Sequence, residues 1–240
     1  MEDTPHFKLG ECDRCPHLNQ RGLCNIILNV GEDYLCDICR EHPRFYNFTS
    51  VAEVGIGMSC PEAARMILSS SEYATIEKIG IFDTNEEIVD FDGRIPRGAI
   101  YDILQNKQLN YQLKIDKICQ KHSICIADDS LWLNKLDSLE YLDIAHKKLF
   151  MNYSSSFRPK NMDEYLERFL AYFIYRHCTE ATDSDDFCDR LSFCLFCERL
   201  FASLIYSENA KTLQDISALA SAISEEIEYS DDNTFALMHG

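Results

Sequence analysis

The sequence predicts a mainly α-helical protein: a helical bundle with an N-terminal cysteine-rich, loop-rich segment and at most a small two-stranded sheet. From Gly98 onward, apolar residues recur three and four positions apart, which is the spacing of one helix face. Before Gly98, only the stretches 51–58 and 75–82 have the composition of strands. Six of the twelve cysteines lie from Cys12 to Cys60, among turn-forming residues.

The sequence divides into three parts. Residues 1–70 are expected to form a metal- or cluster-binding segment, residues 71–97 a connecting strand and loop, and residues 98–240 the helical bundle. A chain of 240 residues is long enough for such a bundle to bury a core of ordinary size.

Local signals predict the elements of the first half in order. Asn19–Gly22 has the composition of a turn, and residues 31–42 predict a short helix that Pro43 stops. After the strand at 51–58, Ser59 is expected to cap a helix that carries Pro61 in its first turn.

The bundle is predicted from helical spacing alone. Residues 100–118 predict one or two helices. Asn161 and Glu164 have the spacing of a capping pair at the start of a later helix. The later helices are expected over 129–150, 162–179, 185–207 and 212–228.

The C-terminal cysteines follow the apolar pattern of these helices. Cys188, Leu191 and Cys194 have helical spacing, and a buried cysteine behaves as a small hydrophobic residue. We therefore interpret these cysteines, together with Cys178 and Cys197, as core residues and not as a second metal site.

Charge narrows the range of partners. The chain has 23 Lys and Arg against 40 Asp and Glu, for a formal net charge of −17. Such a surface repels phosphate backbones and anionic lipids, so we expect neither nucleic acid nor a membrane as a partner. No run of apolar residues is long enough to span a bilayer. The N-terminal residues lack the basic and apolar regions of a signal peptide, so a cytoplasmic location is expected.

The N-terminal cysteines have the spacing of metal ligands. They occur as Cys12-x2-Cys15-x8-Cys24-x11-Cys36-x2-Cys39-x20-Cys60. In a reducing cytosol, paired CxxC thiols bind metal more often than they form disulfides. The predicted ligands are Cys15, Cys24, Cys36 and Cys39, with Cys60 and Cys12 as further candidates. Thiolates suit zinc and iron–sulfur clusters alike, so spacing does not separate the two.

A glycine pattern offers a different interpretation. Glu53-x-Gly55-x-Gly57 follows the first part of the ExGxG loop with which doubly wound methyltransferases hold S-adenosylmethionine. That fold needs alternating strands and helices, and the residues after 98 supply almost only helices. We therefore interpret the stretch as a short strand that leads into the helix after Cys60.

Three motifs resemble those of a known family. The stretches Cys15–Cys24, Leu35–Arg44 and Ser59–Arg65 contain, in order, CPxLxxxGLC, LCxxCxxxPR and SCxEAAR. They resemble the flagellin lysine-N-methylase family, and the similarity extends to Tyr172–His177 and Glu226–Ser230 in the helical part. Family members usually carry an earlier group, CxxxCxxCC, which does not occur in these 240 residues.

The resemblance implies a function that the spacing alone does not. It implies a metal centre, in the form of a [4Fe–4S] cluster or zinc, and an enzyme that transfers a methyl group from S-adenosylmethionine to a lysine. The implied partner is a protein with exposed lysines, such as a flagellin. Neither the motifs nor the composition assign a catalytic residue. The alternative is a non-catalytic cytosolic metal- or cluster-binding module that senses metal or redox state.

Overall fold

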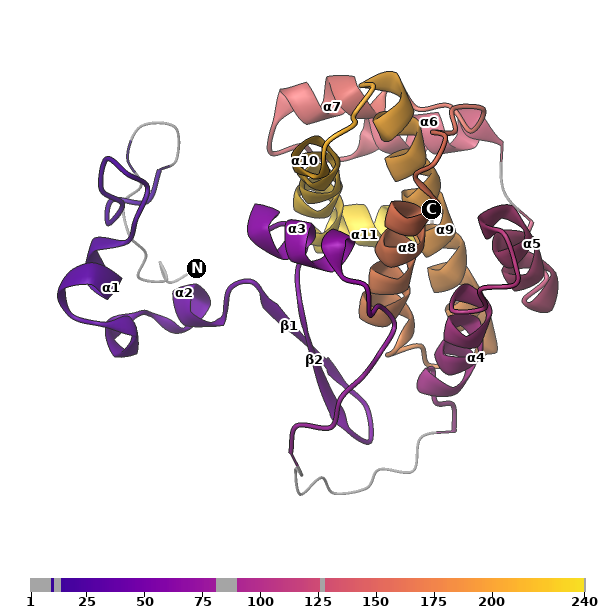
Figure 1. The fold of residues 1–240 in the computed structure, drawn as a ribbon, viewed down its shortest axis with the longest axis horizontal. Coiled ribbons are helices and arrows are strands. Elements are labelled where there is room, and N and C mark those ends of the chain that lie inside the picture. Colours follow the sequence, from indigo (N-terminus) through magenta and orange to yellow (C-terminus); the bar gives the residue numbers. More distant parts are fainter. Residues whose placement is uncertain (1–9, 11–13, 81–89, 126–127, 240) are drawn as a thin grey trace. The chain divides into compact units, whose positions relative to one another are not determined.

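The computed structural model describes residues 10, 14–80, 90–125 and 128–239 (Figure 1). The chain forms two compact units, Met1–His42 and Pro43–Gly240. The described residues are mainly helical, and their one sheet has two strands. This confirms the predicted fold class. No described helix combines the length and apolar character needed to cross a membrane.

The first unit consists of short elements joined by turns. It contains α1 (Asn25–Asn29), the 3-10 helix η2 (Glu32–Tyr34) and α2 (Asp37–Glu41). The helix expected over 31–42 is therefore split between η2 and α2. None of the residues in these three elements is buried. The described part of this unit therefore has no hydrophobic core of its own.

The sheet of the second unit is a hairpin. Strand β1 (Arg44–Phe48) pairs antiparallel with β2 (Ala52–Ile56), in a register that places Arg44 opposite Ile56 and Phe48 opposite Ala52. The β2 strand lies within the expected stretch 51–58.

The prediction of a second strand at 75–82 is wrong. Residues 75–80 form no strand, and residues 81–82 lie outside the described part of the chain. The segment Arg44–Phe48 pairs with β2 instead. Only a three-residue turn separates the two segments, and the side chains of Arg44–Phe48 alternate between buried and exposed faces, as a half-buried strand requires. Phe45 faces the bundle, whereas the rings of Tyr46 and Phe48 stack on the outer face, 6.1 Å apart.

The remaining elements of the second unit are helical. In chain order they are α3 (Pro61–Ser69), α4 (Arg94–Leu104), α5 (Tyr111–Lys121), α6 (Asp129–Ser138), α7 (Ile144–Phe150), α8 (Asp163–Cys178), α9 (Ser184–Ser207), α10 (Leu213–Ile223), the π-helix η3 (Ser224–Glu228) and α11 (Asp231–His239).

Helix boundaries differ from expectation where side chains compete for caps. The helix expected over 129–150 breaks into α6 and α7, because the Asp143 carboxylate accepts the Ala145 N–H and starts a new helix. Cys60, and not Ser59, occupies the N-cap of α3. The Asn161–Glu164 capping pair is wrong: Asn161 has a positive φ of 60°, and Met162 takes the N-cap of α8.

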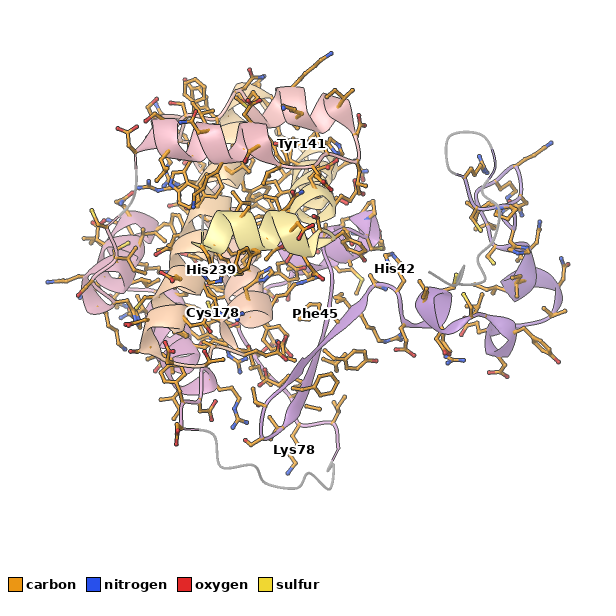
Figure 2. The ribbon with its side chains drawn as sticks, turned by 180° about the vertical axis from the view of Figure 1, so that it is seen from behind. His42, Phe45, Lys78, Tyr141, Cys178 and His239 are labelled. Carbon is orange, nitrogen blue, oxygen red and sulfur yellow. The ribbon has the colours of Figure 1, made fainter. Side chains whose placement is uncertain are left out.

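The core forms mainly around α8 and α9. The ring of Phe169 stacks on Phe173 at 4.5 Å and on Phe201 at 4.2 Å, and all three are fully buried. Cys178, Cys194 and Cys197 are also fully buried, and Cys188 is partly buried. The interpretation as core residues is thus confirmed for Cys178, Cys194 and Cys197, whereas Cys188 lies at the edge of the core. Figure 2 marks Cys178 at the end of α8.

The structure divides the chain at His42, whereas the sequence suggested a cysteine-rich segment up to residue 70. Residues 43–70 belong to the second unit because their apolar side chains pack on the bundle. The Phe45 ring, labelled in Figure 2, lies 6.1 Å from the ring of Tyr172 and 5.8 Å from that of Tyr175. Leu68 of α3 is fully buried.

A buried ion pair joins the hairpin to α4. The Arg97 guanidinium donates to both oxygens of Glu53, at 2.6 and 2.8 Å, and to the Thr179 hydroxyl. Both charged side chains are more than nine-tenths buried. Glu53 of the ExGxG pattern is thus an internal ion-pair partner. As expected, the pattern lies on a strand that leads into the helix after Cys60.

We predict that Arg97→Met lowers the free energy of unfolding by about 3–5 kcal/mol, because it leaves the Glu53 carboxylate buried without its partner. Urea unfolding followed by circular dichroism measures the loss. Arg65→Met, which removes an exposed pair with Glu62, is the matched control and should change stability little. Equal losses of unfolding free energy in the two variants would show that the buried pair stabilises the fold no more than the exposed pair does.

Candidate metal centre

A tight turn brings Cys24 back beside Leu18, three residues after Cys15. The Asn19 side-chain oxygen accepts the backbone N–H groups of Arg21 and Leu23, at 2.8 and 3.1 Å. Gly22 completes the turn with a φ of 75°, which glycine adopts without steric cost. Leu18 and Cys24 then pair as an isolated antiparallel bridge. The turn predicted at Asn19–Gly22 is confirmed, and it returns the chain after Cys15.

The second pair of cysteines begins α2. Cys36 is the N-cap residue and Cys39 lies in the first turn. The Cys39 backbone N–H and the Cys39 thiol both form hydrogen bonds to the Cys36 sulfur, and these bonds lower the pKa of Cys36. The pKa of Cys39 is raised, first by the hydrogen bond to Cys36 and then by partial loss of solvent around the thiol. One thiol of the pair is thus favoured as thiolate, as a metal ligand must be.

The other three predicted ligands of this unit all act on the pKa of Cys39. Besides Cys36, the charges of Cys15 and Cys24 contribute to the raised pKa of Cys39. All four cysteines are free thiols and none is buried. Among the described residues, however, no three His, Cys, Asp or Glu side chains are close enough together to hold a metal ion. The described residues therefore do not form a coordination shell from these thiols.

The chemistry of the four side chains fits a soft metal. A set made only of thiols is the donor set of structural zinc and of iron–sulfur clusters. The absence of buried residues in α1, η2 and α2 points the same way. Segments of this size that cannot bury a core are commonly held together by a metal or by disulfides.

The two further candidates have different positions. Cys60 belongs to the second unit, where it is half-buried at the N-cap of α3, directly before Pro61. Cys12 lies outside the described residues.

The loop that carries Cys60 is fixed by hydrogen bonds to the bundle. The Met58 backbone N–H donates to the Tyr172 hydroxyl at 3.1 Å. The Ser221 hydroxyl of α10 donates to the Ser59 carbonyl at 3.0 Å. Met58 is fully buried and Ser59 nearly so. Cys60 is therefore held in a defined position by α8 and α10.

A buried carboxylate anchors this arrangement. Glu228 accepts the Tyr172 hydroxyl at 2.9 Å and the Ser224 hydroxyl, and its other oxygen lies 2.8 Å from His177 Nε2 and 3.2 Å from Arg176 Nε. Burial raises the pKa of Glu228, but the Arg176 charge and the His177 and Ser224 hydrogen bonds outweigh burial and lower it. Burial lowers the pKa of His177, which keeps the imidazole neutral.

None of the residues in this buried network was predicted as a site residue. The sequence did single out Tyr172–His177 and Glu226–Ser230 as similar to relatives of the flagellin lysine-N-methylase family. In the structure these two stretches contact each other through Glu228. Their pairing was not visible in the sequence, because His177 and Glu228 lie 51 positions apart and the π-helix η3 alters the helical period.

Comparisons with known proteins identify no relatives: no protein-family description, no curated protein and no solved structure matches this chain.

The network predicts a pH dependence of stability. The pKa values of Glu228 and His177 are both lowered in the fold, so the unfolded state binds more protons as the pH falls. Stability is therefore highest above the ordinary His pKa of about 6.5 and is lost below it, by up to about 1.4 kcal/mol per pH unit for His177. In the His177→Gln variant, the thermal midpoint should change less between about pH 7 and pH 5 than it does in the wild type.

Differential scanning calorimetry at a series of pH values measures this effect. His239→Gln, a change at a partly exposed histidine of α11, is the matched control for substituting glutamine. A pH profile of His177→Gln that is parallel to that of the wild type would contradict a neutral, buried His177.

Proposed function

We propose that the first unit binds a soft metal, either as zinc or as a [4Fe–4S] cluster, through Cys15, Cys24, Cys36 and Cys39. The observation that carries the proposal is that the unit holding these four thiols has no buried residue in α1, η2 or α2. Bound metal would supply the stabilisation that apolar burial supplies in the second unit.

Exposed apolar side chains in this unit support the proposal. Ile38, between Cys36 and Cys39, is 83% exposed, and Leu28 and Val30 are more than half exposed. Hydrophobic burial therefore does little to fix the chain there, and metal–thiolate bonds would do so instead. The proposal includes a reducing, cytoplasmic setting, where paired CxxC thiols bind metal more often than they form disulfides.

We predict that protein purified without oxygen contains zinc, or iron with acid-labile sulfide. Cys36→Ser and Cys39→Ser should each sharply lower that content, because each removes one thiolate from the set. Cys125→Ser, a change at an exposed cysteine of the second unit, is the matched control and should leave the content unchanged. Elemental analysis, a sulfide assay and an absorption spectrum measure these outcomes.

Hydrogen exchange provides a second measure that does not depend on metal analysis. Removing the metal with a chelator should speed amide exchange in residues 14–42 far more than in α8 and α9, because metal binding is folding energy for the first unit only. Metal content that is the same in wild type, Cys36→Ser and Cys39→Ser would remove these cysteines from the site.

A second candidate function is methyl transfer from S-adenosylmethionine to a lysine of a partner protein, such as a flagellin. One observation favours it: Met58, directly before the SCxEAAR motif, contacts Tyr172, and Tyr172 contacts Glu228 of the other helical stretch that resembles the same family. In that reaction the methyl group would leave a sulfonium for a neutral lysine nitrogen, which then loses a proton. The acidic surface of the chain would favour a lysine-rich partner.

Calorimetry with S-adenosylmethionine tests this second function. If the resemblance extends to activity, the metal-loaded protein should bind the cofactor and methylate lysines of a lysine-rich protein, as followed by mass spectrometry. Metal binding without cofactor binding would leave the non-catalytic metal- or cluster-binding module, with a sensing role, as the function.

A further inference from the structure

The outer face of the β1–β2 hairpin is apolar. Phe45 and Glu53 lie on the face that packs on the bundle. Side chains alternate along a strand, so the opposite face carries three residues of each strand. They are Arg44, Tyr46 and Phe48 of β1 and Ala52, Val54 and Ile56 of β2. Only one of the six is charged, whereas the solvated face of an antiparallel sheet is usually polar. This face therefore has the composition of a covered surface.

The described residues leave much of this face in solvent. Phe48 is 70% exposed, Tyr46 44% and Val54 38%. Tyr46 lies directly across the ladder from Val54. The planes of the Tyr46 and Phe48 rings differ by only 14°, so the two rings form one continuous aromatic surface. Single exposed apolar residues need no partner, but a contiguous group of them favours a contact with another macromolecule.

The two ends of the face carry opposite charges. Arg44 lies at one end of β1. At the other end, the Glu180 carboxylate accepts the Phe48 backbone N–H at 2.6 Å, which places its charge beside Phe48. A strand rises about 3.3 Å per residue, so about 13 Å separate Arg44 from Phe48. The face thus runs from a positive end through an apolar middle to a negative end.

A face with this layout is complementary to itself. Two copies can pack face to face with their β1 strands antiparallel, about a two-fold axis through Tyr46, the middle residue of β1. Each Arg44 then lies over Phe48 and beside Glu180 of the other copy, where opposite charges attract and the ring faces a cation. A parallel arrangement would instead place Arg44 against Arg44, so charge selects the antiparallel one.

We propose that a second copy of this chain covers the outer face of the hairpin, in a two-fold dimer held by Tyr46 and Phe48 and oriented by Arg44–Glu180 pairs between the copies. The inference does not rest on the proposed function and uses none of its cysteines.

The dimer is expected to be weak. A hairpin face of this size buries much less than the roughly 800 Å² per partner of a stable dimer, so the dissociation constant should be on the order of 0.1 mM. Each copy also carries a net charge of −17. At 0.15 M salt, charges more than about 8 Å apart are largely screened, so the direct contacts at the face decide whether the copies associate.

Sedimentation equilibrium of the whole chain measures the association. The wild type, kept with a thiol reductant in 0.15 M salt, should pass from monomer to dimer between about 10 μM and 1 mM. Phe48→Asp should abolish the dimer, because it places a charge in the apolar contact. Phe235→Asp is the matched control: Phe235 of α11 is 66% exposed and lies outside the hairpin. This control should associate like the wild type.

Charge exchange tests the orientation. Arg44→Glu should weaken association about tenfold or more, because it places a carboxylate against Glu180 of the other copy. The double variant Arg44→Glu/Glu180→Lys forms the same pair with the signs reversed, and it should recover most of the wild-type affinity. Loss of structure in either variant would appear in circular dichroism and is thereby kept apart from loss of the contact.

Three outcomes would overturn the proposal. One is a wild-type chain that sediments as a monomer over the whole concentration range, which would leave the face to a different partner. Another is a dimer that folded Phe48→Asp retains, which would place the contact elsewhere on the chain. The third is a double variant that associates no better than Arg44→Glu, which would exclude the antiparallel arrangement.

Discussion

The second unit depends on keeping one carboxylate ionised in its interior. The Glu228 side chain has no exposed surface, and an unpaired charge in that position would cost several kcal/mol. Arg176 and His177 lie beside one of its oxygens, and Tyr172 and Ser224 donate to the other. Since these partners come from α8 and η3, satisfying one charge fixes the π-helical turn against α8.

The consequences of that arrangement reach the hairpin and α3. The Tyr172 hydroxyl donates to Glu228 and at the same time accepts the Met58 backbone N–H. The loop between β2 and α3, and with it Cys60, is therefore held by the same group that satisfies the buried charge. On the other side of the hairpin, Glu53 and Arg97 form a second buried pair. Polar contacts of this kind define a geometry that apolar packing alone would leave loose.

The first unit is built on a different principle. Its backbone turns are well defined by Asn19 and Gly22, yet its apolar side chains, such as Ile38, remain in solvent. Its described residues form no coordination shell around the four thiols. Under the proposed function, the stability of this unit comes from bonds to the metal.

The sequence by itself determined the helical class, the position of β2, the turn at Asn19–Gly22 and the burial of Cys178, because each depends on periodicity or on the conformational preference of a few neighbouring residues. The strand partner at 75–82 and the cap at Asn161 were predicted wrongly, because pairing and capping depend on competing residues. Only the tertiary structure decided that Glu228 meets His177, because the two lie 51 positions apart in the sequence and no local signal encodes which distant hydrogen-bond partner a buried carboxylate will find.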